Sequence, residues 1–565
     1  MTTFSKMSAS PPFPFVTTRN SGCANKTSTG TISQSHYSSQ SVRLVQRLDS
    51  LLTNVREEQS DIKHAENLMR VKSLFPQLEN PLECMKTIDS LQRLGIDYHF
   101  KEEIRDMLGP VYERFLQKQD HLTGDLFEVS LSFRLLRQAG HHVSSDVFYK
   151  FIDDKGKLDS SLRTDIEGLL SLHEASYLNT GEDILYIAKE FTIEHLTSLM
   201  EHLESDDATL VEQTLKSPIH KTLSRYNSPY YINGRQEKLT RYGVLNEVAR
   251  VDFNQVQTIY QKELFEILSW WKEIGLVQEL TFIRDQPLKW YTWSMTVLPD
   301  PQFSKCRISL TKVIAFVYII DDIFDIYGTL EELSLFTEAI RKWELSGAET
   351  LPTYMQILYK TLYDITNEIA EATYEEHNWN PIDHLKESWA RLCDAFLKEA
   401  KWFQSKKVPK ADEYLANAIV SSGVYTVLLH AYFLLGEGIT QENANFLKTN
   451  PTLLSSPATI LRLWDDLGNA EDENQEGYDG SYVEYLMQEN PNYTMESSRD
   501  HVMKMISSSW EALNKECFSS SQFAPNLVAG CLNLSRMIEV MYSYDTNQNL
   551  PVLEEYITKL LFKSI

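Results

Sequence analysis

Apolar residues recur along this chain at spacings of three and four positions, as in the group Leu264, Ile267, Leu268 and Trp271. That spacing places side chains on one face of an α-helix, which can be buried against a neighbouring helix. The 565 residues include only 21 glycines, about half the usual share, and this favours long helices over a turn-rich β architecture. The pattern predicts an all-α protein.

One predicted helix has an acidic end. The apolar run 313–320 leads directly into the segment 321–325, which reads DDIFD. Asp321 and Asp325 lie four residues apart and would share a helix face, where like charges destabilise the helix and burial adds a desolvation cost. A divalent cation would offset both effects, and a donor set of oxygens alone favours Mg²⁺ or Mn²⁺ over Zn²⁺. The alternative is an acidic helix end that faces solvent.

The end of this helix is also predicted from local signals. A glycine, Gly328, follows the acidic segment, and Thr329 and Glu332 have the spacing of a capping box. In that motif the two side chains bond to each other's backbone N–H groups at the start of a helix. A new helix is therefore expected to begin at Leu330.

A second acidic motif lies downstream, within the segment 460–473. Asp465, Asn469 and Glu473 are spaced at i, i+4 and i+8, so they drift by only about 80° around a helix and can line one face. Arg462 would lie on the same side. Three oxygen ligands suit a metal ion that completes its shell with phosphate oxygens, and a guanidinium matches phosphate geometry. The alternative is a solvated acidic helix terminus.

Together the two motifs resemble the metal sites of class I terpene synthases, which carry DDxxD on one helix and (N/D)DxxSxxxE on a facing helix. The surrounding sequence resembles the plant branch of that family, and the resemblance covers roughly residues 45–560. The ordered set of motifs is far more specific than either metal motif alone. The supporting segments are 88–95 (IDSLQRLG), 133–138 (FRLLRQ), 254–257 (NQVQ), Trp270-Trp271, 283–286 (IRDQ), Trp293, 421–425 (SSGVY) and 477–482 (GYDGSY).

The resemblance implies a metal-dependent lyase whose partner is a small-molecule substrate, a prenyl diphosphate. Three Mg²⁺ ions, with Mn²⁺ as a substitute, would bind the diphosphate. Two would be held by Asp321 and Asp325, and one by Asp465, Asn469 and Glu473. Of these ligands, Asp321, Asp325 and Asp465 would also lie against the diphosphate. The metals would stabilise the negative charge that develops on the leaving diphosphate.

Four further residues belong to the diphosphate site that the resemblance implies. Arg284 matches the first position of the family's RxR element, and Arg462 matches the arginine before the second motif. Both would hold diphosphate oxygens and help to close the site. Asp322 and Asp466, the second aspartate of each motif, would support the neighbouring ligands from behind.

Departure of the diphosphate leaves an allylic carbocation, which needs a pocket that stabilises positive charge without reacting with it. Aromatic faces do this through cation–π attraction. Trp293 aligns with an active-site tryptophan of the family, and Phe324 and Tyr425 are further candidates for the same role. The alternative for all three is ordinary packing in the core.

The chain departs from the family pattern at several positions. The tandem-arginine motif RRx8W of many cyclising synthases is missing, since Arg43 and Arg47 do not reproduce it. The RxR element reads RDQ at 284–286 and so lacks its second arginine. Asn469 replaces the usual Ser or Thr, although its amide oxygen can still coordinate a metal. The late loop 542–549 lacks the Asp-Gly-Tyr of many cyclases.

The missing tandem arginines and the altered late loop resemble the subfamily that makes acyclic products. In that subfamily water can capture the cation at its tertiary carbon, which gives linalool from geranyl diphosphate and nerolidol from farnesyl diphosphate. We expect these alcohols. The alternatives are the acyclic olefins myrcene and ocimene, cyclic monoterpenes made on the same scaffold, a chain-elongating prenyltransferase, and a non-catalytic helical protein.

The resemblance implies two helical domains after a leader. Residues 46–270 would form an N-terminal, α-barrel-like domain without chemistry of its own, and residues 271–565 a C-terminal helical bundle of the class I terpenoid synthase type. Residues 1–45 are expected to be a transit peptide, because residues 1–48 contain five Lys or Arg and no Asp or Glu, a composition typical of plastid targeting. The alternative is a disordered tail on a cytosolic enzyme.

Composition argues against several other classes of protein. A net charge of −25 disfavours nucleic-acid binding, which requires a basic face. The six cysteines are scattered without CxxC pairs and are expected to be reduced thiols. The sequence contains no run of 18 apolar residues, so no membrane span is expected. We expect a monomer.

Overall fold

In the computed structural model, residues 44–48, 58–78, 80–117, 124–234, 243–469, 480–519, 522–545 and 549–565 are described, apart from the side chains of 58–61, 117 and 469. Over these ranges the chain consists of helices joined by turns, with no strand and one isolated bridge, between Ile152 and Leu158. The prediction of an all-α protein is confirmed.

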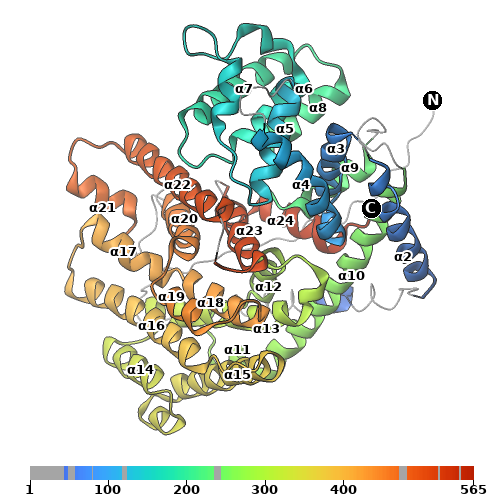
Figure 1. The fold of residues 1–565 in the computed structure, drawn as a ribbon. Helices are drawn as coiled ribbons and strands as arrows, with labels where there is room; N and C mark the ends of the chain where they lie inside the picture. Colours follow the sequence, from blue (N-terminus) through green and yellow to red (C-terminus); the bar gives the residue numbers. More distant parts are fainter. Residues whose placement is uncertain are drawn as a thin grey trace, which may run out of the picture.

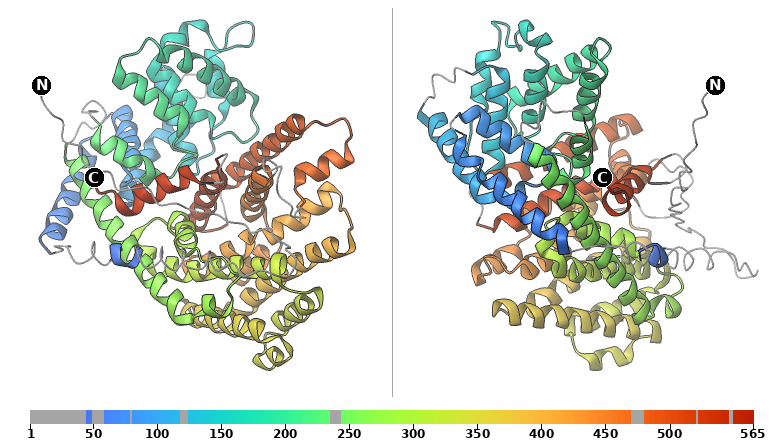
Figure 2. Two further views of the ribbon diagram at one scale, coloured as in Figure 1. Left: turned by 180° about the vertical axis from the view of Figure 1, so that it is seen from behind. Right: turned by 90° about the vertical axis from the view of Figure 1, so that its right-hand side faces the viewer.

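The N-terminal helices form a unit that lies above the rest of the molecule in Figures 1 and 2. Their apolar faces enclose a core that includes Phe133, Leu136, Leu172 and Leu185, each almost completely buried. The helices are α2 (Glu58–Lys72), α3 (Pro81–Leu94), α4 (Lys101–Gln117), α5 (Leu126–Gln138), α6 (Ile166–Ser176), α7 (Asp183–Met200), α8 (Ser205–Lys216) and α9 (Ser224–Asn233).

The C-terminal helices enclose a larger core, in which Trp290, Phe316, Leu428 and Leu463 are fully buried. They occupy the lower part of Figure 1. The helices are α11 (Leu276–Glu279), α12 (Pro287–Val297), α13 (Ser304–Asp322), α14 (Leu330–Lys342), α15 (Thr353–His377), α16 (Ile382–Ser405), α17 (Ala411–Ser421), α18 (Val424–Leu435), α19 (Gln441–Leu447), α20 (Thr452–Asn469), α21 (Tyr482–Glu489), α22 (Met495–Phe518), α23 (Pro525–Tyr542) and α24 (Pro551–Ile557).

A single long helix, α10 (Gly243–Ile274), connects the two units. It runs without a break from the N-terminal helices down into the C-terminal bundle (Figure 1). The domain boundary expected at residue 270 therefore lies inside a continuous helix, close to its C-terminal end. That boundary remains a prediction.

The two units are also joined by hydrogen bonds from α22. The side-chain amide of Asn514 donates to the backbone carbonyls of Tyr177 (3.1 Å) and Asn179 (2.8 Å). Its carbonyl oxygen lies 2.8 Å from Nε2 of His220. One buried side chain thus bonds to two loops of the N-terminal unit, and this fixes α22 against it.

A buried ion pair ties together the helices that lead to the acidic motif. The guanidinium of Arg307, on α13, donates from Nε and Nη2 to the two carboxylate oxygens of Glu263 on α10, at 2.8 and 2.6 Å. The same guanidinium donates to the Leu298 carbonyl at 2.7 Å, and the Tyr291 hydroxyl donates to Glu263 at 2.8 Å. Because this pair is fully hydrogen-bonded, it can remain charged inside the core.

One stretch, Ala411–Leu435, is long and apolar enough to cross a membrane by length and composition, and 78% of its most apolar window is buried inside the protein. It consists of two helices, α17 and α18, which are separated at Gly423 in a left-handed conformation (φ 74°). A stretch that is mostly covered by other helices and broken in its middle is better explained as part of the core.

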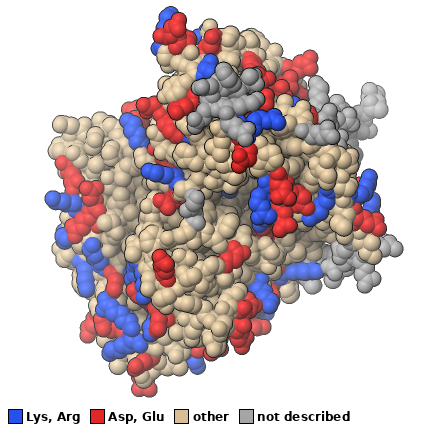
Figure 3. Space-filling model, viewed as in Figure 1, with Lys and Arg blue, Asp and Glu red and all other residues tan. Residues whose placement is uncertain are grey.

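Charged side chains of both signs are interspersed over the face of the molecule shown in Figure 3. Several of them form exposed ion pairs between neighbouring helices, such as Lys448 with Glu387 (2.5 Å) and Lys407 with Glu413 (3.0 Å). Pairs of this kind contribute little to stability.

Gly423 is constrained by its backbone and by its neighbour. Its φ of 74° is unfavourable for residues with a Cβ, and an added Cβ would lie 2.4 Å from Cγ1 of Val317 on α13. We expect Gly423→Ala to lower the free energy of unfolding by about 2 to 4 kcal/mol, combining backbone strain with overpacking, as measured by chemical denaturation.

Gly438 provides the matched control for this substitution. Its φ is 65°, and no atom lies within 4 Å of an added Cβ. Gly438→Ala should therefore show the backbone cost alone, about 1 kcal/mol. Equal destabilisation by the two substitutions would contradict the steric role that we assign to Val317.

Candidate active site

The first acidic motif is held against an arginine that precedes α12. Arg284 forms an ion pair with Asp321 through Nη2, and its Nε lies 2.6 Å from Oδ1 of Asp322. The backbone N–H of Arg284 donates to Oδ2 of Asp322 at 2.7 Å. Arg284 also donates to the backbone carbonyl of Tyr318 (3.2 Å). Two adjacent carboxylates at the end of α13 therefore share one guanidinium.

The second acidic motif repeats this arrangement on α20. Arg462 forms an ion pair with Asp465, and its Nε donates to Oδ1 of Asp466 at 2.8 Å. The Tyr414 hydroxyl donates to Oδ1 of Asp466 at 3.0 Å, and the backbone N–H of Tyr482 donates to Oδ2 at 2.9 Å. Again one guanidinium serves two adjacent carboxylates, and again one carboxylate accepts a backbone N–H.

The two aspartates of each motif differ in burial. The side chains of Asp322 and Asp466 are 2% and 0% exposed, whereas those of Asp321 and Asp465 are 29% and 16% exposed. The buried aspartate of each pair therefore anchors the arginine, and the other presents its carboxylate toward open space. Both partly exposed carboxylates are oxygen donors, the type of ligand that suits Mg²⁺.

Burial also shifts the ionisation of the two anchoring carboxylates. Desolvation raises the pKa of Asp322 to about 6, and the neighbouring Arg284 guanidinium opposes that rise. Desolvation likewise raises the pKa of Asp466 to about 6, opposed by Arg462. Since an arginine remains charged throughout the physiological pH range, both carboxylates are mainly ionised at neutral pH.

The remaining predicted metal ligands lie at the ends of these helices. Asp325 is exposed and lies in a π-helical turn, Ile323–Tyr327, that directly follows α13. Such turns are frequent at functional sites. Asn469 is the last residue of α20, and its side chain lies outside the described part of the chain, as does the whole of Glu473. The roles of these three residues remain predictions.

Beyond the π-helical turn, the predicted capping box is confirmed. The backbone N–H of Thr329 donates to Glu332 at 3.0 Å, and the backbone N–H of Glu332 donates to Oγ1 of Thr329 at 3.3 Å. Helix α14 begins at Leu330. The chain thus leaves the first motif in a direction fixed by this cap.

Glu399 is a further carboxyl near the two motifs, and no motif in the sequence pointed to it. It projects from α16, and its Oε1 accepts hydrogen bonds from Asn417 Nδ2 and Ser421 Oγ, both at 2.8 Å. Burial raises the pKa of Glu399 to about 7; Arg462 opposes the rise and Asp321 adds to it. Glu399 is therefore close enough to Arg462 and to Asp321 to interact electrostatically with one residue at each motif.

Tyr542, at the C-terminal end of α23, interacts with the second acidic motif and with Tyr318. Burial raises its pKa, and the Asp465 carboxylate and the Tyr318 hydroxyl add to the shift. Its backbone carbonyl would lie 3.8 Å from a Cβ added at Gly468. Tyr542 belongs to the late loop that the sequence marked only for a missing motif. Neither Tyr542 nor Glu399 lies in a motif of fixed spacing, so single-sequence reasoning had no signal for them.

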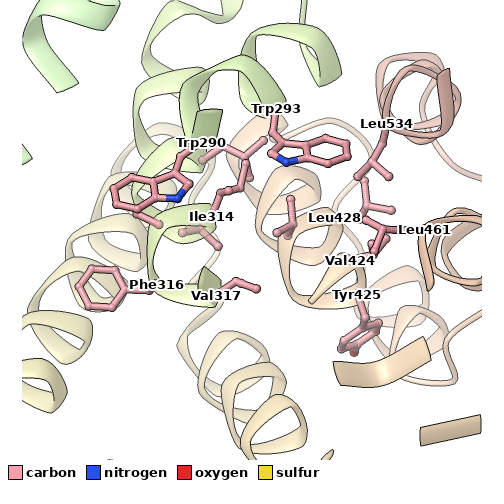
Figure 4. Close-up of a cluster of buried hydrophobic side chains, with 14 of the residues drawn as sticks. Trp290, Trp293, Ile314, Phe316, Val317, Val424, Tyr425, Leu428, Leu461 and Leu534 are labelled. Atoms are coloured by element: carbon pink, nitrogen blue, oxygen red, sulfur yellow. The ribbon is translucent and has the colours of Figure 1, made fainter. Parts of the chain in front are cut away.

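The aromatic candidates occupy different surroundings. Trp293 is buried on α12 and points toward Leu428, Val424 and Leu534 in Figure 4. Its indole N–H donates to the Tyr318 hydroxyl at 3.1 Å. Trp293 therefore lies next to apolar side chains of the bundle and also bonds to Tyr318, which lies beside Arg284. Its role with a carbocation remains a prediction that this position favours.

Phe324 and Tyr425 have aromatic or cationic partners elsewhere. The Phe324 ring packs against Phe396 of α16, with ring centroids 5.6 Å apart. Tyr425 points away from Trp293 in Figure 4, and the Arg391 guanidinium lies 4.3 Å from its ring centroid. These contacts favour the alternative interpretation, in which Phe324 and Tyr425 pack in the core. The roles predicted for the two residues with the carbocation stay predictions.

Within the described residues, one further group of side chains is close enough to hold a metal. His64, His99 and Asp252 have ligand atoms within 4.8 Å of one another in the N-terminal unit. However, Arg225 already donates to Oδ2 of Asp252 at 3.0 Å, and the Tyr98 hydroxyl bonds to Oδ1. A guanidinium in contact with the carboxylate opposes a second cation there, so we interpret this group as a hydrogen-bonded joint between helices.

Comparison with known proteins identifies related chains. Residues 38–219 match the family model described as the terpene synthase N-terminal domain, and residues 272–512 match that described as the terpene synthase metal binding domain. The chain is 45% identical over 512 residues to an (E)-nerolidol synthase of Cannabis sativa, covering 89% of this chain and 92% of that protein. It is 43% identical over 505 residues to the chloroplastic S-(+)-linalool synthase of Arabidopsis thaliana, covering 88% of each.

The fold is likewise similar to a solved structure. Isoprene synthase from grey poplar (Populus x canescens), in complex with three Mg²⁺ ions and dimethylallyl-S-thiolodiphosphate, matches with a TM-score of 0.80 at 33% identity, covering 94% of this chain and 97% of that one. The match spans both helical units. Together with the match to the metal binding domain, it supports the use of a divalent metal.

Because the pKa of Glu399 is raised in the folded protein, the free energy of unfolding should depend on pH. The folded protein holds this proton up to about pH 7, whereas an unfolded chain loses it near its ordinary value, so the free energy of unfolding falls as pH rises between these values and then levels off. Glu399→Gln removes the titration but keeps an oxygen acceptor. The melting temperature of the variant, relative to wild type, should therefore rise between pH 5 and pH 7.5, by the equivalent of about 2 kcal/mol.

Glu387→Gln, on the same helix, is the matched control, because Glu387 is 46% exposed and pairs with Lys448 at the surface. Its melting temperature relative to wild type should be almost the same at both pH values. If the difference in melting temperature between Glu399→Gln and wild type does not change with pH, a raised pKa of Glu399 is contradicted.

Proposed function

Because this chain belongs to the terpene synthase family, a family of lyases, we propose that it ionises geranyl diphosphate and captures the allylic cation with water. The products are linalool and diphosphate. Farnesyl diphosphate is the second proposed substrate and gives nerolidol. The observation that carries this proposal is the arginine–aspartate group at each acidic motif, in which a guanidinium pairs with a partly exposed carboxylate.

The two arginine–aspartate groups suit a diphosphate. Arg284 and Arg462 each present a guanidinium whose planar donors match phosphate oxygens. Asp321 and Asp465, the partly exposed carboxylates, would hold Mg²⁺, together with Asp325, Asn469 and Glu473 in our assignment; Mn²⁺ is the expected substitute. When bound, the metal supplies Lewis-acid stabilisation of the leaving diphosphate.

The chain's own residues then serve three tasks. The buried carboxylates of Asp322 and Asp466 hold the two arginines in place, so that the guanidinium groups need not reorganise as charge develops on the diphosphate. Trp293 offers an aromatic face to the allylic cation. The apolar side chains around Trp293 exclude bulk water, which would otherwise react with the cation.

Two lines of support favour an acyclic alcohol as product. The relatives described above include a nerolidol synthase and a linalool synthase. The sequence also lacks the tandem arginines and the second arginine of the RxR element found in many cyclases. Acyclic olefins and cyclic monoterpenes are the alternatives, and both would share the same ionisation step.

We further propose a plastid location and a monomeric state, with the catalytic domain beginning near residue 271. The acid-free composition of the leader supports plastid targeting, as does the chloroplastic linalool synthase among the relatives. Residues 1–43 of the leader lie outside the described part of the chain. Plastids mainly supply the ten-carbon substrate, so this location favours linalool over nerolidol.

Product analysis tests the proposed function. The full chain is incubated with Mg²⁺ and either geranyl or farnesyl diphosphate, and products are separated by gas chromatography–mass spectrometry on a chiral column. We expect linalool and nerolidol as the main products, respectively. Limonene-like or bicyclic products would replace this proposal with a cyclase, and longer chains formed on addition of isopentenyl diphosphate would indicate a prenyltransferase.

The metal assignment has its own test. Asp321→Ala should lower the rate of diphosphate release at saturating Mg²⁺ by at least about 100-fold, because removal of a ligand loses several kcal/mol of transition-state stabilisation. Asp383→Ala is the matched control: this aspartate is 77% exposed and pairs with Lys386 at the surface of α16. Unchanged turnover in a folded Asp321→Ala protein would refute the assignment.

A further inference from the structure

Capture of the cation by water imposes a strict requirement on position. In the allylic cation the positive charge is shared by the carbon that carried the diphosphate and by the tertiary carbon two positions along the chain. Attack at the tertiary carbon therefore takes place only a few ångströms from the departed diphosphate. A water that gives linalool must be held at the charged end of the space, beside the diphosphate, and not at its apolar end.

Tyr318 lies at the boundary between these two ends. It is on α13, three residues before Asp321 and therefore on the same helix face. The Arg284 guanidinium lies 4.9 Å from the centroid of its ring, and Arg284 also donates to its backbone carbonyl at 3.2 Å. The residue is only partly buried, which fits a side chain that borders open space.

The hydroxyl of Tyr318 is held in a defined direction. It accepts the indole N–H of Trp293 at 3.1 Å, the same tryptophan that we assign to the cation. That bond uses one lone pair of the phenolic oxygen, so the hydroxyl keeps its proton and a second lone pair with which to hold a water. The bond thus places a polar group between the diphosphate-binding arginine and the aromatic face that meets the cation.

The side chains that surround Trp293 are mostly apolar. The cluster around Trp293 in Figure 4 consists of apolar residues, among them Ile314, Val317 and Leu428. Two hydroxyls nearby, those of Ser294 and Thr311, are buried and bond to each other at 2.5 Å. An ordered water needs at least two polar partners, and we assign Tyr318 and an oxygen of the diphosphate to that role; the phenols of Tyr542 and Tyr544 are other polar groups near Tyr318.

We propose that the Tyr318 hydroxyl holds the water that captures the allylic cation, and so determines alcohol instead of olefin as the product. The inference rests on the proposed function. Tyr318 is a positioning residue, because the water and not the tyrosine forms the new bond. It would be the residue through which this chain directs the cation to hydration before a proton is lost from carbon.

The hydration step requires only the cation, one water and the diphosphate anion. A lone pair of the water forms the bond to the tertiary carbon, and the double bond settles between the two carbons nearest the former diphosphate. The resulting oxonium loses one proton to an oxygen of the diphosphate anion, which leaves as the protonated product. Burial raises the pKa of Tyr318 to about 12, so the phenol stays protonated and does not serve as the base.

Tyr318→Phe tests this role, because it removes the hydroxyl but keeps the ring beneath Arg284 and the backbone carbonyl. With geranyl diphosphate and Mg²⁺, the ratio of linalool to acyclic olefins should fall by about tenfold or more, since the loss of one hydrogen bond to the water costs about 1 to 2 kcal/mol. The ratio compares products of the same active site, so a partial loss of folded protein does not change it.

Tyr432→Phe is the matched control. Tyr432 is 1% exposed on α18, and its hydroxyl donates to the Gly438 carbonyl at 3.0 Å, so the substitution also removes one hydrogen-bonded phenol. Its product ratio should equal that of wild type. Reactions in H₂¹⁸O should label the linalool from every variant, which separates capture of the cation from release of alcohol by a contaminating phosphatase.

The outcomes distinguish this inference from the function on which it rests. If wild type makes labelled linalool and Tyr318→Phe keeps the wild-type ratio, the role of Tyr318 is refuted and the proposed function stands. If wild type makes only olefins or cyclic products, the water-capturing function is refuted, and the role of Tyr318 with it. A fall in the ratio for both Tyr318→Phe and Tyr432→Phe would refute a specific role for Tyr318.

Discussion

Each acidic motif places two adjacent carboxylates at the end of a buried helix, and the desolvation of those charges constrains everything around them. A buried carboxylate without a partner is strongly destabilising. Here the buried member of each pair, Asp322 or Asp466, bonds to one arginine and to one backbone N–H. The other member is thereby left partly exposed. The doublet in each motif thus has two different functions, an anchor and a candidate ligand.

This constraint explains why the site depends on elements far apart in the sequence. Arg284 precedes α12, whereas the carboxylates that hold it end α13, so the two helices must keep a fixed relation. The buried pair between Arg307 and Glu263 supplies that relation, because it joins α13 to α10 and to the chain between α12 and α13. The N-terminal unit contributes indirectly, through α10 and through the bonds of Asn514.

The charged and apolar parts of the site meet at one tyrosine. On one side lie Arg284 and Asp321, which suit a diphosphate, and on the other lies Trp293 with its apolar neighbours. Tyr318 contacts both sides through its ring, its carbonyl and its hydroxyl. The chemistry of a terpene synthase requires such a boundary, because an anion must be held within a few ångströms of a cation that nothing may quench prematurely.

The sequence by itself determined the fold class, the capping box before α14 and the two acidic motifs with their arginines, because each depends on residues close together in the chain or on a recognisable order of motifs. The family resemblance assigned Asp322 and Asp466 a supporting role behind the ligands, but the sequence did not show that they would bond to the two arginines. It contained no signal for Glu399 or Tyr318. It also nominated Phe324 and Tyr425, whose neighbours in the structure are Phe396 and Arg391. Only the tertiary structure decided which carboxylate is buried, which aromatic ring faces the apolar space and which hydroxyl lies beside Arg284. Those properties follow from the packing of several helices, and the packing depends on contacts between residues far apart in the chain.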